Sequence, residues 1–159
     1  ELNAAYVDDH PPDELIRVTN GADYGWPYAN PNPDSLNGMD FMPMDPDYDN
    51  NRLWANHPES AFARIAKGIQ AHSAALGITF FGDKPVVPSL RQGVAVALHG
   101  SWNRRQKTGY KVVWFPWFAP ASVPLAQQDL VTGFLNADGN SSWDRPVDVA
   151  VLNDGSVIV

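Results

Sequence analysis

Cysteine is absent from this chain of 159 residues, which excludes disulfides, thiolate catalysis and zinc sites built on cysteine. Long apolar runs are also absent, so no stretch predicts a membrane-spanning helix. Basic residues are scarce: 11 Lys and Arg against 18 Asp and Glu give a formal net charge of −7. That sign opposes binding to the phosphates of nucleic acid, and we expect no nucleic-acid partner.

Motifs for nucleotide phosphates and for common hydrolases are missing as well. No Gly-x-Gly-x-x-Gly or Gly-Lys-Ser/Thr string occurs. Ser101 lies in Gly-Ser-Trp-Asn rather than in the Gly-x-Ser-x-Gly elbow that exposes a nucleophile. The 4 histidines have no compact metal-binding spacing, which disfavours zinc.

Glycine, proline and aromatic residues are plentiful, and the apolar runs between them are short and rich in β-formers. This pattern predicts an all-β chain, as a sandwich, barrel or propeller. Asn153–Gly155 predicts a hairpin turn between the last two strands. The one helical candidate is short, at Pro58–Lys67. We expect strands at Leu15–Val18, Leu76–Phe81, Gly93–His99, Tyr110–Phe115, Pro146–Leu152 and Ser156–Val159.

Charge is spread unevenly along the chain. Residues 1–49 hold eleven acids and one base, a net of −10, whereas residues 50–159 have a net of +3. The acidic third suits either a cation held by oxygen ligands or a solvated acidic surface. Asp45–Asn56 begins like an EF-hand loop but lacks its Gly and final Glu, so a looser Ca²⁺ contact or Asx turns are expected there. The irregular stretch 28–57 predicts a functional or metal-ordered loop.

Two histidines and a basic cluster are the remaining candidates for chemistry. His72 and His99 lie beside predicted strands, where they serve either as ligand groups or as packing residues. The basic cluster lies beside Trp102 and Tyr110 and either clamps a flat polycarboxylate or forms a solvated hairpin tip. Its members are Arg104, Arg105, Lys107 and Lys111.

Several strings, taken in order, make the chain recognisable. Together they resemble the PQQ-dependent glucose/sorbosone dehydrogenase family, in its sorbosone (aldose) dehydrogenase branch, over nearly the whole chain. Tyr-Gly-Trp-Pro and His-Gly-Ser-Trp-Asn-Arg are the most specific of them. The strings are Asp8–Leu15, Asn20–Tyr28, Ala71–Phe80, Leu98–Arg104, Gly109–Val113 and Arg145–Val149, followed by Asn153–Gly155.

The resemblance implies a six-bladed β-propeller that binds pyrroloquinoline quinone (PQQ) and Ca²⁺, with residues 1–159 covering roughly the last three blades. Such enzymes oxidise an aldose or sorbosone-like sugar by hydride transfer to PQQ and pass electrons to a respiratory acceptor, which implies a periplasmic or secreted protein. Their catalytic His belongs to an earlier blade, so we expect this chain alone to lack activity. The absence of an initiator Met and the apolar end at Gly155–Val159 also lead us to expect a piece of a longer protein.

For Ca²⁺, the resemblance implies two groups of ligands. The segment before Asp-Glu supplies backbone oxygens to the PQQ-bound ion in related glucose dehydrogenases, and this segment falls at Asp8 and Asp9 here. A second, structural ion is implied at Glu14, Tyr24 and Asp34. Oxygen ligands of this kind are those Ca²⁺ prefers.

For PQQ, the resemblance implies Arg145 and either Arg104 or its neighbour Asn103, with His72 and His99 at the rim of the pocket. PQQ carries three carboxylates, which planar Arg forks suit. A further Arg of the glucose dehydrogenases corresponds to Val147 here, so that contact is lost.

Two other readings stay open. A propeller of this kind also serves as a non-catalytic, Ca²⁺-stabilised binding module for a glycan or another partner. A Ca²⁺-dependent lactone hydrolase is disfavoured because its carboxylate-rich metal set has no match in these strings. The upstream His and Arg of the family distinguish the dehydrogenase from the binding module.

Overall fold

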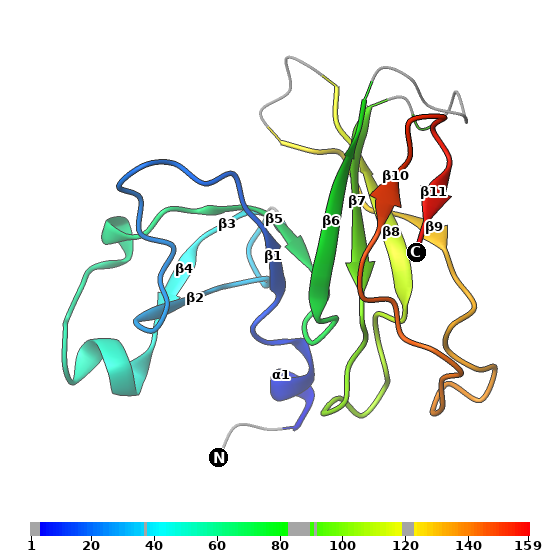
Figure 1. Cartoon of the computed structure of the whole chain (residues 1–159). Helices are drawn as coiled ribbons and strands as arrows, with labels where there is room; N and C mark the ends of the chain where they lie inside the picture. The colour runs from blue at the N-terminus through cyan, green and yellow to red at the C-terminus, as the bar shows by residue number, and fades with distance from the viewer. Residues whose placement is uncertain (1–3, 37, 83–89, 91, 119–122) are drawn as a thin grey trace. The chain divides into compact units, whose positions relative to one another are not determined.

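The computed structural model describes residues 4–36, 38–82, 90, 92–118 and 123–159. The chain divides into two compact units, Glu1–Ala71 and His72–Val159, and each is considered by itself (Figure 1). None of the helices in the described ranges has the length and apolar character that crossing a membrane requires.

The first unit contains two small antiparallel sheets and short helices. In one sheet the central strand β5 pairs with β1 on one side and β3 on the other, and in the second sheet β2 pairs with β4. Their bounds are β1 Asp13–Leu15, β2 Ala29–Pro31, β3 Asp40–Met42, β4 Met44–Pro46 and β5 Ile65–Ile69, with α1 at Ala4–Asp9, a π-helical turn at Tyr48–Arg52 and a 3₁₀ turn at Glu59–Ala61.

The core of this unit is built from methionine, isoleucine and phenylalanine. Met42, Met44 and Ile65 are almost fully buried, and partly buried Tyr24 and Tyr28 pack against them. Burial of each large apolar side chain contributes about 1.5–3 kcal/mol to folding. These contacts draw β3, β4 and β5 around one small core.

The prediction of a helix at Pro58–Lys67 is wrong. Only the 3₁₀ turn Glu59–Ala61 forms, and the chain is extended from Phe62 into β5. Pairing of β5 with two neighbouring strands satisfies more backbone groups than an isolated helix of two turns could stabilise.

The first strand lies earlier than the predicted Leu15–Val18. β1 ends at Leu15, and the Tyr24 hydroxyl then donates to the Arg17 carbonyl at 2.9 Å and accepts from the Thr19 amide at 2.9 Å. Tyr24 therefore binds the backbone of residues 17–19, which leave the β-sheet and turn instead of continuing β1.

The stretch 28–57 is more regular than predicted, because β2, β3, β4 and the π-helical turn all lie in it. Asp47 caps this turn, its Oδ1 accepting from the Asn50 amide at 2.7 Å. Buried Asn51 donates through its amide to the His57 carbonyl at 2.8 Å and accepts from the His57 backbone at 2.7 Å. This segment is ordered by capping and backbone mimicry rather than by an EF-hand.

The second unit is a four-stranded antiparallel meander in the order β6-β7-β8-β9, with the hairpin β10-β11 after it. Residues 99–110 connect β7 to β8. The bounds are β6 Ala75–Phe81, β7 Gly93–Leu98, β8 Lys111–Pro116, β9 Gln128–Val131, β10 Ala150–Val151 and β11 Val157–Ile158.

Burial on both faces explains why the two central strands, β7 and β8, have almost continuously apolar sequences. Every residue of β7 is buried, as is β8 after Lys111, so both faces of each strand are covered. On one face Ala95, Ala97, Val112 and Trp114 form a core with Val149, which precedes β10.

The prediction of an all-β chain is confirmed in this coarse form, and the Asn153–Gly155 hairpin forms between β10 and β11. The sheets of the described residues are open, and a four-stranded antiparallel sheet such as β6–β9 is the repeating unit of a β-propeller blade.

Candidate functional site

Three loops of the second unit meet at the end of the sheet where β6 begins and β7 ends. The His99 amide donates to the Ala74 carbonyl at 3.0 Å, and the Gly100 amide donates to the Ser73 carbonyl at 2.8 Å. The segment before β10 joins them, because His99 Nδ1 lies 3.1 Å from the Pro146 carbonyl oxygen. We call this set of loops, 72–74, 99–110 and 145–148, the loop cluster.

Arg145 fastens the loop cluster through its guanidinium. Its Nε donates to the His99 carbonyl at 3.1 Å, and its Nη2 donates to the Gly100 carbonyl. Its Cζ lies 5.3 Å from the centroid of the Tyr110 ring, within range of a cation–π interaction. The side chain is therefore held in one orientation, and two of its donor atoms point to the backbone.

The Tyr110 ring is buried under the loop between β7 and β8. It is 4% exposed, and its hydroxyl donates to the Ser101 carbonyl at 2.5 Å. Ser101 is 1% exposed and closes the loop, its amide donating to the Thr108 carbonyl at 2.9 Å and its Oγ accepting from the Thr108 amide at 3.0 Å. Lys107 Nζ lies 5.9 Å from the same tyrosine ring.

His99 is fixed in one tautomer by its hydrogen bond. A carbonyl oxygen can only accept, so Nδ1 of the neutral ring carries the proton toward Pro146. Nε2 then keeps its lone pair, and the half-buried ring can accept a hydrogen bond there.

Ser73 adds a polar group that sequence reasoning missed. Its Oγ is buried and has no hydrogen-bond partner among the described residues. An unpaired buried hydroxyl costs about 1–3 kcal/mol, so it suits a position where a polar ligand supplies the partner. Its place directly after His72 was the only available signal.

The other predicted cofactor residues lie on the loop between β7 and β8. Asn103 is exposed, and half-buried Arg104 donates through Nη1 to the Gln106 carbonyl at 2.6 Å. Lys111 instead pairs with Asp129 across β8 and β9 at 2.6 Å. The structure thus brings His99 and Arg145 into direct contact and keeps Lys111 in the sheet. Half-buried His72 opens the loop before β6 with a φ of 65°.

The residues predicted for Ca²⁺ lie in the first unit. Asp8 and Asp9 end α1, and Asp9 Oδ1 accepts from Gln70 Nε2 at 3.0 Å. Asp34 Oδ2 lies 3.2 Å from His10 Nε2. Tyr24 uses its hydroxyl within its own turn, as described above. In the described part of the chain, no group of three or more His, Asp or Glu side chains is placed to hold a metal.

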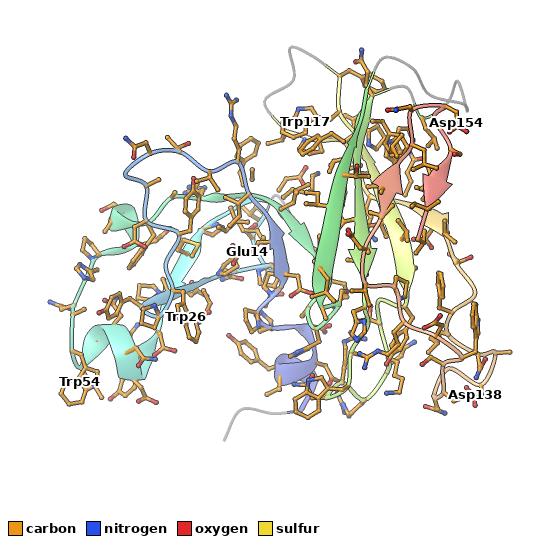
Figure 2. The ribbon with its side chains drawn as sticks, viewed as in Figure 1. Glu14, Trp26, Trp54, Trp117, Asp138 and Asp154 are labelled. Atoms are coloured by element: carbon orange, nitrogen blue, oxygen red, sulfur yellow. The ribbon has the colours of Figure 1, made fainter. Side chains whose placement is uncertain are left out.

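Glu14 is the member of this set whose surroundings suit a cation. It lies in β1, where its register partner in β5 is Gly68, and its side chain is labelled in Figure 2. Burial, and then the neighbouring Asp13 carboxylate, raise the pKa of Glu14 to about 7. A cation would relieve both effects, because it stabilises the ionised carboxylate.

The raised pKa predicts that stability falls as the pH rises. Below pH 4.5 Glu14 is protonated in both states; between pH 4.5 and 7 the unfolded chain ionises first, and above pH 7 the loss is complete. Glu14→Gln should remove this dependence and melt above the wild type at alkaline pH in thermal unfolding. Glu59→Gln, on an exposed residue, is the control. Equal pH profiles for the wild type and Glu14→Gln would contradict the assignment.

Comparisons with known proteins agree with this fold. A family model described as TrAA12-like matches residues 13–157. An uncharacterized protein of Borreliella burgdorferi is 27% identical over 153 residues, which are 95% of this chain and 36% of that protein. The holo form of the pyranose dehydrogenase PQQ domain from Coprinopsis cinerea matches with a TM-score of 0.57 and 24% identity, over 84% of this chain and 36% of that one. The chain thus spans 36% of the length of each of these two proteins.

Proposed function

Because this chain belongs to the TrAA12-like family, we propose that it is part of a PQQ- and Ca²⁺-dependent dehydrogenase that oxidises an aldose or sorbosone-like sugar. The PQQ domain of the Coprinopsis cinerea pyranose dehydrogenase resembles it in fold. The observation that carries the proposal is the loop cluster, in which a fixed Arg145, an oriented His99 and the unpaired Ser73 hydroxyl belong to connected loops.

The donor set of the loop cluster fits a flat tricarboxylate. Arg104 and Arg145 carry the positive charge, and the Ser73 hydroxyl needs a partner. Asn103, His72 and His99 would complete the rim. Bound PQQ would supply the hydride acceptor that amino acid side chains lack.

Ca²⁺ would be held by the acidic first unit. We assign Asp8 and Asp9 as backbone ligands, and Glu14, Tyr24 and Asp34 as ligands of a second ion. The half-buried Glu14 carboxyl with its raised pKa supports this assignment. Asp34 would have to leave His10 in exchange for the ion.

The wider setting is also a proposal. The four-stranded sheet β6–β9 supports a six-bladed propeller of which residues 1–159 form roughly the last three blades. We place the proton-accepting His of the reaction outside this chain, so the chain alone would bind PQQ without turning over sugar. A respiratory electron acceptor and a periplasmic or secreted location complete the proposal.

A titration of PQQ and Ca²⁺, followed by thermal shift, tests this function through binding. Saturable binding should stabilise the chain by RT ln(1 + [L]/Kd), about 2.7 kcal/mol at a hundredfold excess over Kd. Arg104→Ala should weaken PQQ binding roughly tenfold or more, because a hydrogen bond to a charged group contributes about 1.5–3 kcal/mol.

Arg64→Ala is the matched control, since it removes the same charge from an exposed position of the first unit. No stabilisation by PQQ, or equal stabilisation of the wild type and Arg104→Ala, would contradict the cofactor site. Stabilisation by Ca²⁺ without any response to PQQ would favour the non-catalytic binding module.

A further inference from the structure

The loop between β9 and β10 carries a pair of stacked aromatic rings at the protein surface. The Phe134 and Trp143 rings lie 5.3 Å apart between centroids, with 19° between their planes. Trp143 is nevertheless 68% exposed, so Phe134 covers only part of the indole. We call this pair the aromatic platform.

Hydrogen bonds hold the aromatic platform in place. Trp143 Nε1 donates to the Gly133 carbonyl at 2.6 Å, and the Trp143 amide donates to the Phe134 carbonyl at 3.1 Å. A β-bridge joins Leu135 to Ser142 between them. The indole is therefore fixed before any ligand arrives, and its polar atom is already satisfied.

The Leu135–Ser142 bridge closes a hairpin, and hydrogen bonds to Asp138 also order the tip of this hairpin. Asp138, labelled in Figure 2, accepts from the amides of Asn140 and Ser141 at 2.9 and 3.0 Å and from Ser141 Oγ at 2.8 Å. These hydrogen bonds, the first being that of Asn140, lower the pKa of the Asp138 carboxyl. Asp138 therefore remains anionic across the physiological range.

The other strongly exposed tryptophans differ from Trp143. Trp26, Trp54 and Trp102 are each more than 80% exposed, yet within the described ranges none of them stacks on a second ring. Single exposed apolar residues are common and need no explanation, whereas Trp143 is an exposed ring held in place by a second ring and a hydrogen bond.

The charge around the platform restricts the ligand. Residues 132–144 contain Asp138 and Asp144 and no Lys or Arg, and the next residue, Arg145, directs two of its donor atoms to backbone carbonyls of the loop cluster, which opposes nucleic acid and anionic lipid. The same hairpin carries short polar side chains that hydrogen-bond to one another or to Asp138, and their remaining amide hydrogens and oxygen lone pairs can bind hydroxyl groups. They are those of Asn136, Asn140 and Ser141, with Ser142 beside them. A neutral ring with an apolar face and hydroxyl groups at its edge matches both properties.

We propose that the aromatic platform is a carbohydrate-binding site that stacks the apolar face of a neutral sugar ring on Trp143. This site adjoins the loop cluster in sequence, since Trp143 lies two residues before Arg145, but it would hold a saccharide chain at the surface rather than present a reacting carbon. The proposal does not depend on the cofactor, because it rests on the geometry and charge of one hairpin.

Affinity electrophoresis in native gels tests the platform with defined polymers. The gels contain hydroxyethylcellulose or dextran and neither PQQ nor Ca²⁺, so a failure here leaves the cofactor titration unaffected. We expect at least one polymer to retard the wild type, and Trp143→Ala to bind it about tenfold more weakly or not at all. Trp143→Phe keeps a ring but loses the hydrogen bond to Gly133, and its retardation should be intermediate.

Trp54→Ala, which removes an equally bulky exposed side chain from the first unit, should be retarded like the wild type. Thermal melts of each variant show whether it is folded. Failure of both polymers to retard the wild type, or equal retardation of wild type and folded Trp143→Ala, would overturn the proposal. Tighter binding to oligothymidylate than to either glucan would also overturn it, in favour of a base-stacking surface.

Discussion

Gly109→Ala should destabilise the second unit by about 3 kcal/mol, because the loop cluster leaves no room for a side chain there. A Cβ at this position would lie 2.7 Å from Gly100 Cα and 2.8 Å from the Ser73 carbonyl oxygen. Both are backbone atoms, which cannot rotate away as a side chain would. Gly109 also has a φ of 81°, in the left-handed region that glycine tolerates best. Urea unfolding followed by fluorescence measures the loss.

Gly139→Ala is the control that measures the cost of the left-handed backbone alone, without a steric clash of the new Cβ with neighbouring atoms. Gly139 has a φ of 68°, but nothing lies within 4 Å of its hypothetical Cβ. This variant should lose only the left-handed contribution, about 1–2 kcal/mol. Equal losses in the two variants would show that Gly109 does not contact Gly100 and Ser73 as described, and the loop cluster would need revision.

Asp40→Ala should be the second strongly destabilising change, at about 3 kcal/mol. Lys67 lies in β5 and is 5% exposed, and its Nζ pairs with Asp40 Oδ1 of β3 at 2.5 Å. Removing the carboxylate leaves a buried ammonium without its counter-charge, which is far more costly than losing a surface ion pair. Chemical denaturation of the variant measures the change.

Lys67→Met is the informative companion, because it removes the buried charge and keeps the volume of the side chain. Asp40 is 46% exposed at its side chain and can be hydrated, so this variant should lie within about 1 kcal/mol of the wild type. The double variant Asp40→Ala/Lys67→Met should recover most of the stability lost in Asp40→Ala. No recovery would mean that Asp40 acts through β3 itself rather than through Lys67.

The strands of the second unit could be predicted because local sequence and tertiary environment agree there. β7 is a continuous apolar run and β8 is rich in valine and aromatic residues, both strands are buried on both faces, and turn residues separate them. In the first unit, local sequence and tertiary environment disagree. Pro58–Lys67 has helical propensity, yet Phe62 and Ile65 are drawn into the core and β5 pairs with two strands.

The sequence indicated which residues are candidates for the site but not how they are arranged. The His99 and Arg145 strings proposed both residues, which lie 46 positions apart, and only the folded chain shows Arg145 donating to the His99 carbonyl. The unpaired state of the Ser73 hydroxyl and the Phe134–Trp143 stack could not be predicted from the sequence, because burial and ring geometry arise from packing.

What the sequence by itself determined is the chemistry available to this protein: no thiol, an acidic first third, and Arg and His residues beside β-strand ends. It also determined the all-β class, because strand periodicity and turn residues act over a few neighbouring positions. The tertiary structure alone decided which tautomer His99 adopts, that Glu14 holds its proton to about pH 7, and that Trp143 presents an open face. Each of these depends on groups distant in sequence or on solvent exclusion, and both arise only when the chain is folded.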